Sequence, residues 1–433
     1  MDIQKIIKKE IKYQQQQLKL IPSENYVNPE VMQAVGSVFM NKYAEGYSNK
    51  RYYAGNINVD EIELTCKERA LKLFNLNTDE WHANVQAVTG SIANLAVYNS
   101  ILSLGDRILS MSLTDGGHLS HGWKLSNGKK VTFTSKIYES HFYHVSPDTY
   151  LLDYDEIEKQ ARKIKPKLII SGGTAYPRTI DYQRLGQIAH NINAYYLADV
   201  AHEAGLIAAG VHDSPFPHAD FVTMTTRKTL RGPIGAIIIA KKEFADVLDR
   251  SVFPGLLGGP MINSIAGIAI ALKQADTAEF SQYSRQVILN AKKLAEELIE
   301  QDFNVITQGT DKHLILIDVR NKQPDGLTTA LLLESADIIA NKNTIAFDNT
   351  GTPWRPSGLR LGTPAVTTRG MREQEMKAIA ELINMTIESI HFKPNTKTNE
   401  IRTILNESKQ LLEIKDKVHK LTQKFPVYTE LTQ

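Results

Sequence analysis

The chain has 433 residues, of which 42% are hydrophobic and 23% charged, a composition typical of a folded protein large enough for more than one hydrophobic core. Lysine and arginine (50) nearly balance aspartate and glutamate (48), which argues against nucleic acid or an anionic membrane as the main partner. The single cysteine, Cys66, excludes intrachain disulfides and cysteine-based zinc sites; we expect it to be a buried small hydrophobe in a reducing cytoplasm.

The N-terminal segment carries charges at helical spacing and has no unbroken apolar run. It therefore fits neither a signal peptide nor a membrane anchor. We expect residues 1–35 to form an amphipathic helical arm that packs on a neighbour, such as a second subunit, and the alternative is an ordinary surface helix.

Between about residue 80 and residue 245, short apolar runs alternate with longer periodic stretches, which is typical of an α/β domain. Buried strands are predicted at 107–111, 167–170, 194–198, 221–224 and 236–240, and helices at 154–165 and 182–191. Because ligands of such sheets bind beyond the carboxyl ends of the strands, the residues that follow these runs are candidate site residues.

After Pro260 the pattern predicts a smaller α+β domain. Helices are expected near 264–274 and 282–301, a strand at 313–317, and a closing amphipathic helix over 399–424. The predicted organisation is an N-terminal arm (1–35), a large domain (36–262) and a small domain (263–433).

A search for common motifs finds no strand-linked dinucleotide fingerprint, no Walker phosphate loop and no H-E-x-x-H zinc motif. His118 and His121 have the spacing of a metal-binding pair. Neither a carboxylate nor a cysteine follows at a recognisable distance, so no metal is predicted.

The most informative segment is 223–233, which follows a strand and places Lys228 among hydroxyls, including that of Thr226, and beside a second cation, Arg227. Desolvation and a neighbouring positive charge both lower the pKa of an ammonium group, as a Schiff-base lysine requires. The spacing alone leaves open a surface lysine in a polar loop.

Two further segments fit this chemistry. Asp199 ends an apolar strand, and a carboxylate buried there needs a cationic partner, which the pyridinium nitrogen of pyridoxal phosphate supplies. Residues 88–94 form a small-residue turn before a helical run, an arrangement suited to a phosphate group at a helix N-terminus.

Together with 116–119, these segments resemble the serine hydroxymethyltransferases, which are pyridoxal-phosphate enzymes of fold type I. The resemblance extends from 20–26 to 358–365, and 41–47 followed by 50–53 is especially specific. It implies an α/β fold like that of aspartate aminotransferase, with a large, mainly parallel sheet. The implied reaction is the reversible conversion of L-serine and tetrahydrofolate to glycine and 5,10-methylenetetrahydrofolate through a pyridoxal-phosphate aldimine. A cytoplasmic homodimer is implied, and whether dimers pair into tetramers stays open.

The resemblance also implies roles for individual residues. Lys228 would hold the cofactor covalently, Asp199 would pair with its pyridine nitrogen, and His118 would stack on its ring. Further cofactor contacts would come from His202, Thr174, Gly90, Ser91, Tyr43, Gly258 and Gly259, although His202 could instead be a core histidine. The substrates would be bound by Arg360 with Ser23 at the serine carboxylate, by Leu119 and Asn343 at the folate, and by Glu45 and Tyr53.

Several of these residues would act across a dimer interface. Glu45, Tyr43, Tyr53, Gly258 and Gly259 match positions that reach into the partner's site, so each site would be complete only in the dimer. Glu45 would transfer protons at the hydroxymethyl and folate end. The catalytic set predicted in this way is Lys228, Glu45, His118, Asp199, Tyr53 and Thr226.

Three residues depart from the family pattern. Arg227 stands where histidine is usual, and Ile234 stands where arginine is usual, so one cation is lost near the site as another is gained. Ile92 replaces a usual glutamine and removes a hydrogen-bond partner of the cofactor phosphate. Weaker cofactor affinity is one expected result.

Two competing hypotheses remain. A folate-independent aldolase or transaldolase acting on β-hydroxy amino acids could use the same scaffold, but the retained Glu45, Leu119 and Asn343 argue against it. A non-catalytic relative is disfavoured because Lys228 and Asp199 are retained.

Overall fold

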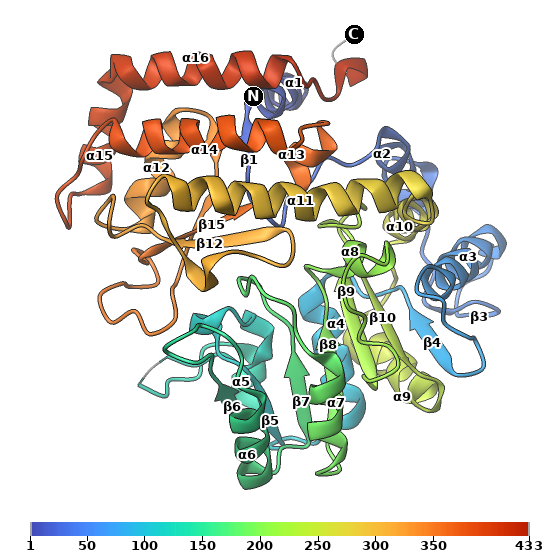
Figure 1. The fold of residues 1–433 in the computed structure, drawn as a ribbon. Coiled ribbons are helices and arrows are strands. Elements are labelled where there is room, and N and C mark those ends of the chain that lie inside the picture. Colours follow the sequence, from blue (N-terminus) through green and yellow to red (C-terminus); the bar gives the residue numbers. More distant parts are fainter. Residues whose placement is uncertain (1, 126, 432–433) are drawn as a thin grey trace. The chain divides into compact units, whose positions relative to one another are not determined.

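The computed structural model describes residues 2–125 and 127–431 (Figure 1). The chain forms two compact units. The large unit comprises Val27–Thr174 and Thr179–Arg285, and the small unit comprises Met1–Tyr26, Ala175–Arg178 and Gln286–Gln433. The division into an arm and two domains made from the sequence stays a prediction.

A seven-stranded sheet forms the centre of the large unit. Its strands are β4 (Trp81–Asn84), β5 (Arg107–Met111), β6 (Glu139–Tyr143), β7 (Leu168–Ser171), β8 (Tyr195–Asp199), β9 (Phe221–Thr225) and β10 (Ala236–Lys241). The order is β4-β10-β9-β8-β7-β5-β6, with parallel pairing from β6 to β9 and antiparallel pairing of β10 with β9 and β4. The predicted α/β domain is confirmed, with each of its five predicted strands present; β4 and β6 were not predicted.

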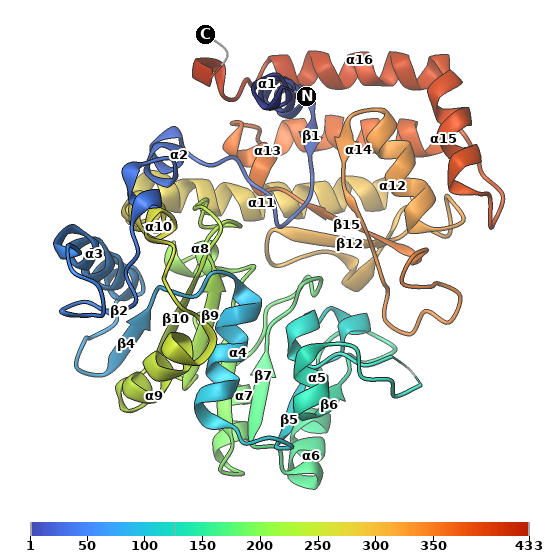
Figure 2. The ribbon, with the colours of Figure 1, turned by 180° about the vertical axis from the view of Figure 1, so that it is seen from behind.

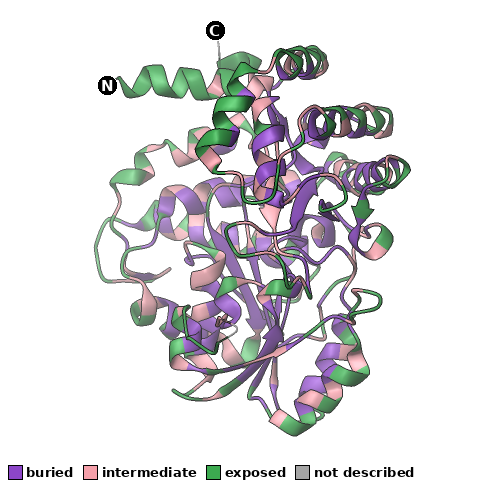
Figure 3. Ribbon diagram, turned by 90° about the vertical axis from the view of Figure 1, so that its left-hand side faces the viewer, coloured by how far each residue is buried: buried purple, intermediate pink, exposed green. Residues whose placement is uncertain are grey.

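Helices cover both faces of this sheet: α7 lies in front of it in Figure 1, and α4 lies in front of it in the view from behind in Figure 2. The helices of the large unit are α2 (Pro29–Val35), α3 (Ile57–Leu73), α4 (Gly90–Ile101), α5 (Phe133–Ile137), α6 (Tyr154–Ile164), α7 (Tyr182–His190), α8 (Ala204–Ala208), α9 (Ala245–Arg250) and α10 (Ile262–Ala275). The predicted helices α6, α7 and α10 are confirmed. Since both faces are covered, the strands consist largely of buried residues (Figure 3).

The small unit has a four-stranded antiparallel sheet with the order β11-β12-β15-β14. These strands are β11 (Asn304–Val305), β12 (Leu314–Asp318), β15 (Gly358–Gly362) and β14 (Asn341–Asn343), and β12 is the strand predicted at 313–317. The buried faces of α12 (Gly326–Ser335), α14 (Glu373–Glu388), α15 (Thr398–Glu407) and α16 (Lys409–Gln423) share one hydrophobic core with this sheet. The predicted helix at 282–301 is α11 (Ala278–Glu300), which begins in the large unit and ends in the small one.

The single closing helix predicted over 399–424 is wrong, because the structure has two helices there. Ser408 separates α15 from α16 with an extended backbone (φ −78°, ψ 111°). Its hydroxyl accepts a hydrogen bond from the Leu411 N–H at 3.3 Å, so it begins a new helix where the apolar periodicity alone predicted continuity.

The predicted N-terminal arm is helical only in part. After α1 (Ile3–Gln16), the strand β1 (Leu18–Lys19) pairs with β13 (Ile338–Ile339). The side chain of Gln15 donates to the Val427 carbonyl at 3.0 Å, so the arm contacts the C-terminal end of its own unit. No residue of α1 is buried, and its packing on a second subunit stays a prediction. Among the described helices, none combines the length and the apolar character of a membrane-spanning segment.

Cys66 lies on α3 and is fully buried, as predicted, and burial raises the pKa of its thiol far above the ordinary value. We expect the native protein to be unreactive toward a thiol reagent such as iodoacetamide at pH 8, because the thiolate is the reactive form. After unfolding in guanidinium chloride, the single cysteine should react fully. Mass spectrometry measures both states, with Cys66→Ala as the blank, and rapid alkylation of the native chain would contradict this burial.

Candidate active site

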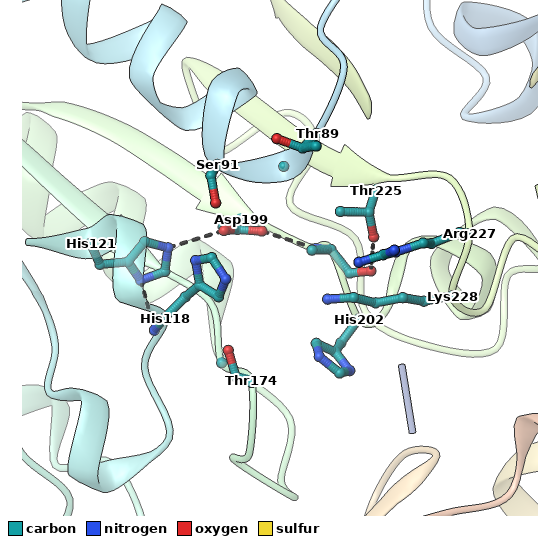
Figure 4. Close-up of a pocket in the computed structure, with 13 residues that line it drawn as sticks. Thr89, Ser91, His118, His121, Thr174, Asp199, His202, Thr225, Arg227 and Lys228 are labelled. Carbon is teal, nitrogen blue, oxygen red and sulfur yellow. Dashed lines mark hydrogen bonds and ion pairs between the residues drawn. The ribbon is translucent and has the colours of Figure 1, made fainter. Parts of the chain in front are cut away.

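A pocket in the large unit lies at the carboxyl ends of its parallel strands (Figure 4). It is lined by Thr89, Gly90, Ser91, His118, His121, Gly173, Thr174, Asp199, Ala201, His202, Thr225, Arg227 and Lys228. Asp199 ends β8 and Thr225 ends β9, while Gly173 follows β7. The pocket therefore occupies the edge of the sheet that the sequence indicated.

The carboxylate of Asp199 has a fixed set of donors. Its Oδ2 accepts from Asn94 Nδ2 at 2.8 Å and from His121 Nε2 at 3.0 Å, and its Oδ1 accepts from the Ala201 N–H at 3.1 Å. Burial by itself raises the pKa of this carboxyl group, but the hydrogen bonds and the neighbouring histidines together lower it well below its ordinary value. Asp199 is therefore an anion at neutral pH, although its side chain is only 8% exposed.

The proton of His121 is positioned by its neighbour. The backbone N–H of His118 donates to His121 Nδ1 at 3.4 Å, so in the neutral ring Nε2 carries the hydrogen that reaches Asp199. The ring of His118 itself is uncharged at neutral pH, because burial and, to a lesser extent, the nearby His121 lower its pKa to about 4. Its Nδ1 bonds to the Ser120 hydroxyl at 2.7 Å.

Lys228 lies in the loop after β9, and only 8% of the residue is exposed. Thr226 braces this loop: its hydroxyl donates to the Pro233 carbonyl at 2.7 Å, and its carbonyl accepts from the Gly232 N–H at 2.7 Å. The Thr226 hydroxyl therefore stabilises the loop, and Thr226 does not line the pocket. Its catalytic role stays a prediction.

The first turn of α4 offers backbone donors to the pocket. Thr89 caps the helix by accepting from the Ile92 N–H at 3.4 Å, while the N–H groups of Gly90 and Ser91 make no hydrogen bond within the described part of the chain. A Cβ at position 90 would lie 2.8 Å from the Thr225 Cγ2, so glycine lets the helix start pack against the end of β9. Free N–H groups at a helix N-terminus favour an anion.

A second group of predicted residues gathers outside this pocket, on the same unit. The rings of Tyr43 and Tyr53 are 5.1 Å apart. A Cβ at Gly259 would lie 3.4 Å from the Tyr43 ring, and one at Gly258 would lie 3.3 Å from Glu45 Oε1. Tyr43 and Tyr53 are 57% and 43% exposed, so this cluster is open to solvent in the single chain.

The remaining predicted residues are divided between the units. Leu119 is 49% exposed beside His118 in the large unit. Ser23, Asn343 and Arg360 belong to the small unit, where Arg360 is 6% exposed on β15 and its Nε donates to Asn341 Oδ1 at 3.1 Å. Burial lowers the pKa of this guanidinium to about 10, so it stays charged at neutral pH.

Sequence reasoning missed the two side chains that donate to Asp199, Asn94 and His121. Asn94 lies in a segment chosen for phosphate binding, and its position on the buried side of α4 was the available signal. His121 was considered only for a metal site, and the argument that no carboxylate accompanies it is wrong. Potential ligand atoms of His118, His121 and Asp199 lie within 4.8 Å of one another, because folding brings Asp199 from 78 positions away. The prediction of no metal stays a prediction.

The sheet order and a pocket that combines a lysine, a buried carboxylate and a helix N-terminus define an α/β enzyme of the type that binds an anionic cofactor. Residues 1–383 match the family model described as serine hydroxymethyltransferase, and the chain belongs to this family. Membership confirms the resemblance drawn from the sequence, including the fold of type I pyridoxal-phosphate enzymes. It also implies dependence on pyridoxal phosphate.

The residues of the pocket fit this cofactor. Asp199 offers a buried, charged acceptor for a pyridinium N–H, and the neutral ring of His118 lines the same pocket. Lys228 supplies a primary amine, and the unused N–H groups of Gly90 and Ser91 suit a phosphate group.

The low pKa of His118 has a measurable effect on stability. The folded pKa of about 4 lies below the ordinary 6.5, so the unfolded chain binds more protons between these values. The contribution of His118 to the free energy of unfolding is therefore full above pH 6.5 and is lost as the pH falls toward 4. It corresponds to about 3 kcal/mol.

Urea unfolding of the cofactor-free chain and of His118→Gln at several pH values between 4 and 7 measures this effect. The unchanged chain should lose about 3 kcal/mol more than the variant over this range. Equal losses would show that His118 titrates normally in the folded protein.

Proposed function

We propose that this protein catalyses the reversible reaction of L-serine with tetrahydrofolate to give glycine, 5,10-methylenetetrahydrofolate and water. One observation carries the proposal: Lys228, Asp199 and the start of α4 line the same pocket. The chain also belongs to the serine hydroxymethyltransferase family. We place the cofactor there, with Lys228 Nζ as its covalent attachment point. Pyridoxal phosphate, when bound, supplies an electron sink for the bonds at the substrate Cα.

Asp199 has two tasks in this proposal. Its carboxylate keeps a proton on the pyridine nitrogen, because an anion that stays charged in a buried site favours the protonated form of a base beside it. It also fixes the position of the ring, since His121, Asn94 and Ala201 hold both carboxylate oxygens in place.

Arg360 binds the substrate carboxylate in this proposal. The planar guanidinium can donate two parallel hydrogen bonds to a carboxylate, and Ser23 assists it. A charged group that is 6% exposed and hydrogen-bonded to Asn341 has little freedom to move. Anchoring the carboxylate would set which bond at Cα faces the cofactor ring, and this orientation selects the bond that breaks.

Glu45, Leu119 and Asn343 favour a folate-dependent reaction over the aldolase alternative. In this proposal Leu119 and Asn343 contact the folate, and Glu45 exchanges protons at the hydroxymethyl end. The Glu45 carboxylate lies beside the Tyr43 hydroxyl and raises its pKa, so this tyrosine stays protonated and can donate a hydrogen bond.

The exposed cluster of Tyr43, Glu45, Tyr53, Gly258 and Gly259 is our proposed contribution to the site of a second subunit. None of these five residues lines the pocket of its own chain, although the family resemblance gives them contacts with cofactor and substrate. A homodimer with shared sites reconciles the two observations. We place this enzyme in the cytoplasm.

The reaction is tested by following serine cleavage with and without tetrahydrofolate in the presence of pyridoxal phosphate. We expect folate to accelerate glycine formation at least about 100-fold, and Lys228→Arg to lower turnover at least about 1,000-fold, since the guanidinium cannot replace the amine. After borohydride reduction, mass spectrometry should find the cofactor attached to Lys228. Lys167→Arg changes an exposed lysine immediately before β7 and is the matched control.

The outcomes separate the hypotheses. A cofactor adduct on Lys228 with cleavage of β-hydroxy amino acids that ignores folate would favour the aldolase. The absence of any adduct would contradict both enzymes.

Shared sites predict complementation between two inactive variants. In a mixed dimer of Lys228→Gln and Glu45→Gln chains, one site receives both mutations and the other receives neither. Random reassociation of equal amounts should therefore restore about a quarter of the unmodified activity. Activity is measured after mixing, dissociation and refolding, with each variant alone as the control. If each site uses its own Glu45, no activity will return.

A further inference from the structure

Arg227 lines the pocket and has no partner of its own. Its guanidinium makes no hydrogen bond and no ion pair within the residues that the structure describes. Figure 4 shows its side chain extending into the pocket in the same direction as that of Lys228. A guanidinium carries five N–H donors and a permanent charge, so an unpaired one beside a pocket is available to an anionic ligand.

The other arginine of this loop, Arg231, already contacts two aromatic rings. The Arg231 guanidinium lies 4.4 Å from the ring centre of Tyr283 and 5.6 Å from that of Phe280, both in the large unit. The hydrogen bonds of Thr226 to Pro233, Gly232 and Gly235 hold the backbone next to Arg227. The loop therefore fixes the backbone of Arg227 at the pocket, and the guanidinium of this residue has no partner among the described residues.

The anion-binding end of the pocket is close to this position. Gly90, at the start of α4, packs against Thr225, which precedes Arg227 by two residues. The free N–H groups of Gly90 and Ser91 and the guanidinium of Arg227 line the same pocket. Together they provide N–H donors and a positive charge, as a phosphate dianion requires.

We propose that Arg227 is a phosphate-binding residue of this chain. The inference rests on the proposed function, because the phosphate is that of pyridoxal phosphate. Ile234 is 58% exposed and offers no donor, and Ile92 in the first turn of α4 offers none from its side chain. Arg227 lines the pocket and offers side-chain N–H donors, which neither of these two residues does.

A guanidinium differs from the usual histidine at this position in its titration. Histidine loses its charge near pH 6.5, whereas arginine keeps its charge throughout the physiological range. The charge that arginine contributes to phosphate binding is therefore the same at pH 6 and at pH 8, and only the protonation of the phosphate group changes. With histidine at this position, the contribution would fall between these two values.

The test compares two probes, pyridoxal phosphate and pyridoxal, which differ only by the phosphate group. Each is titrated into cofactor-free protein, and binding is followed by the visible absorbance of the lysine-bound form. Arg227→Gln should raise the dissociation constant for pyridoxal phosphate at least about tenfold, because a charge-assisted hydrogen bond is lost. The dissociation constant for pyridoxal should not change.

Three further variants sharpen the result. Arg227→Lys should retain part of the affinity, since it keeps the charge and loses the planar fork. Arg227→His should bind pyridoxal phosphate more weakly at pH 8 than at pH 6, relative to the unchanged chain. Arg107→Gln removes an exposed arginine at the opposite end of the sheet, also without a side-chain partner in the described residues, and should change nothing.

Equal affinity of Arg227→Gln and the unchanged chain for pyridoxal phosphate would overturn the inference. Equal losses for both probes would also overturn it, since Arg227 would then act on the covalent attachment or on the fold. If the unchanged chain bound neither probe, the proposed function itself would fail, and this outcome is distinct from the other two.

Discussion

The buried carboxylate of Asp199 is the interaction on which the pocket depends. A charge that is almost removed from water is strongly unfavourable unless hydrogen bonds and opposite charges replace its hydration. Here the donors come from separate parts of the chain: Asn94 on α4, His121 after β5, and the backbone of Ala201 after β8 itself. The anion is stable only when these elements are packed together, so the site and the fold of the large unit depend on one another.

The other side of the pocket's chemistry is positive: groups that attract negative charge line the same pocket as this anion. Lys228, Arg227 and the N-terminus of α4 all line the pocket, and each favours negative charge. A zwitterionic cofactor with a protonated nitrogen and a phosphate group satisfies both sets. The uncharged ring of His118 adds a flat surface to the pocket without adding charge.

The remaining residues of the proposed site are distributed over other parts of the chain. Arg360, Ser23 and Asn343 belong to the small unit, and the exposed cluster that contains Glu45 lies outside the pocket of its own chain. The pocket proposed for the cofactor thus lies within one compact unit, while most of the groups proposed for serine and folate lie outside this pocket. In this proposal the small unit supplies the group that holds the substrate carboxylate, and a second subunit adds contacts to both cofactor and substrate.

The sequence by itself determined the α/β class, the five strands named from its apolar runs, the position of Asp199 at a strand end and that of Lys228 in the loop after a strand. Apolar runs of strand length and the polar residues that follow them are local features, and local features can be read without tertiary information. Motif order also identified the family, and the match over residues 1–383 confirms it. By contrast, the break at Ser408 was missed because a helix cap can interrupt an apolar pattern without changing its period.

Only the tertiary structure decided which groups surround Asp199. It also showed that Arg231 lies over the ring of Tyr283, while Arg227 has no partner among the residues that the structure describes. Asn94 and His121 are 105 and 78 positions from Asp199, and no periodicity relates them to it. Their contacts depend on the order of strands in the sheet and on the packing of α4 against it, and these follow from the summed burial of the whole unit. The sequence therefore named the chemical groups, and the packing of the sheet decided which of them meet.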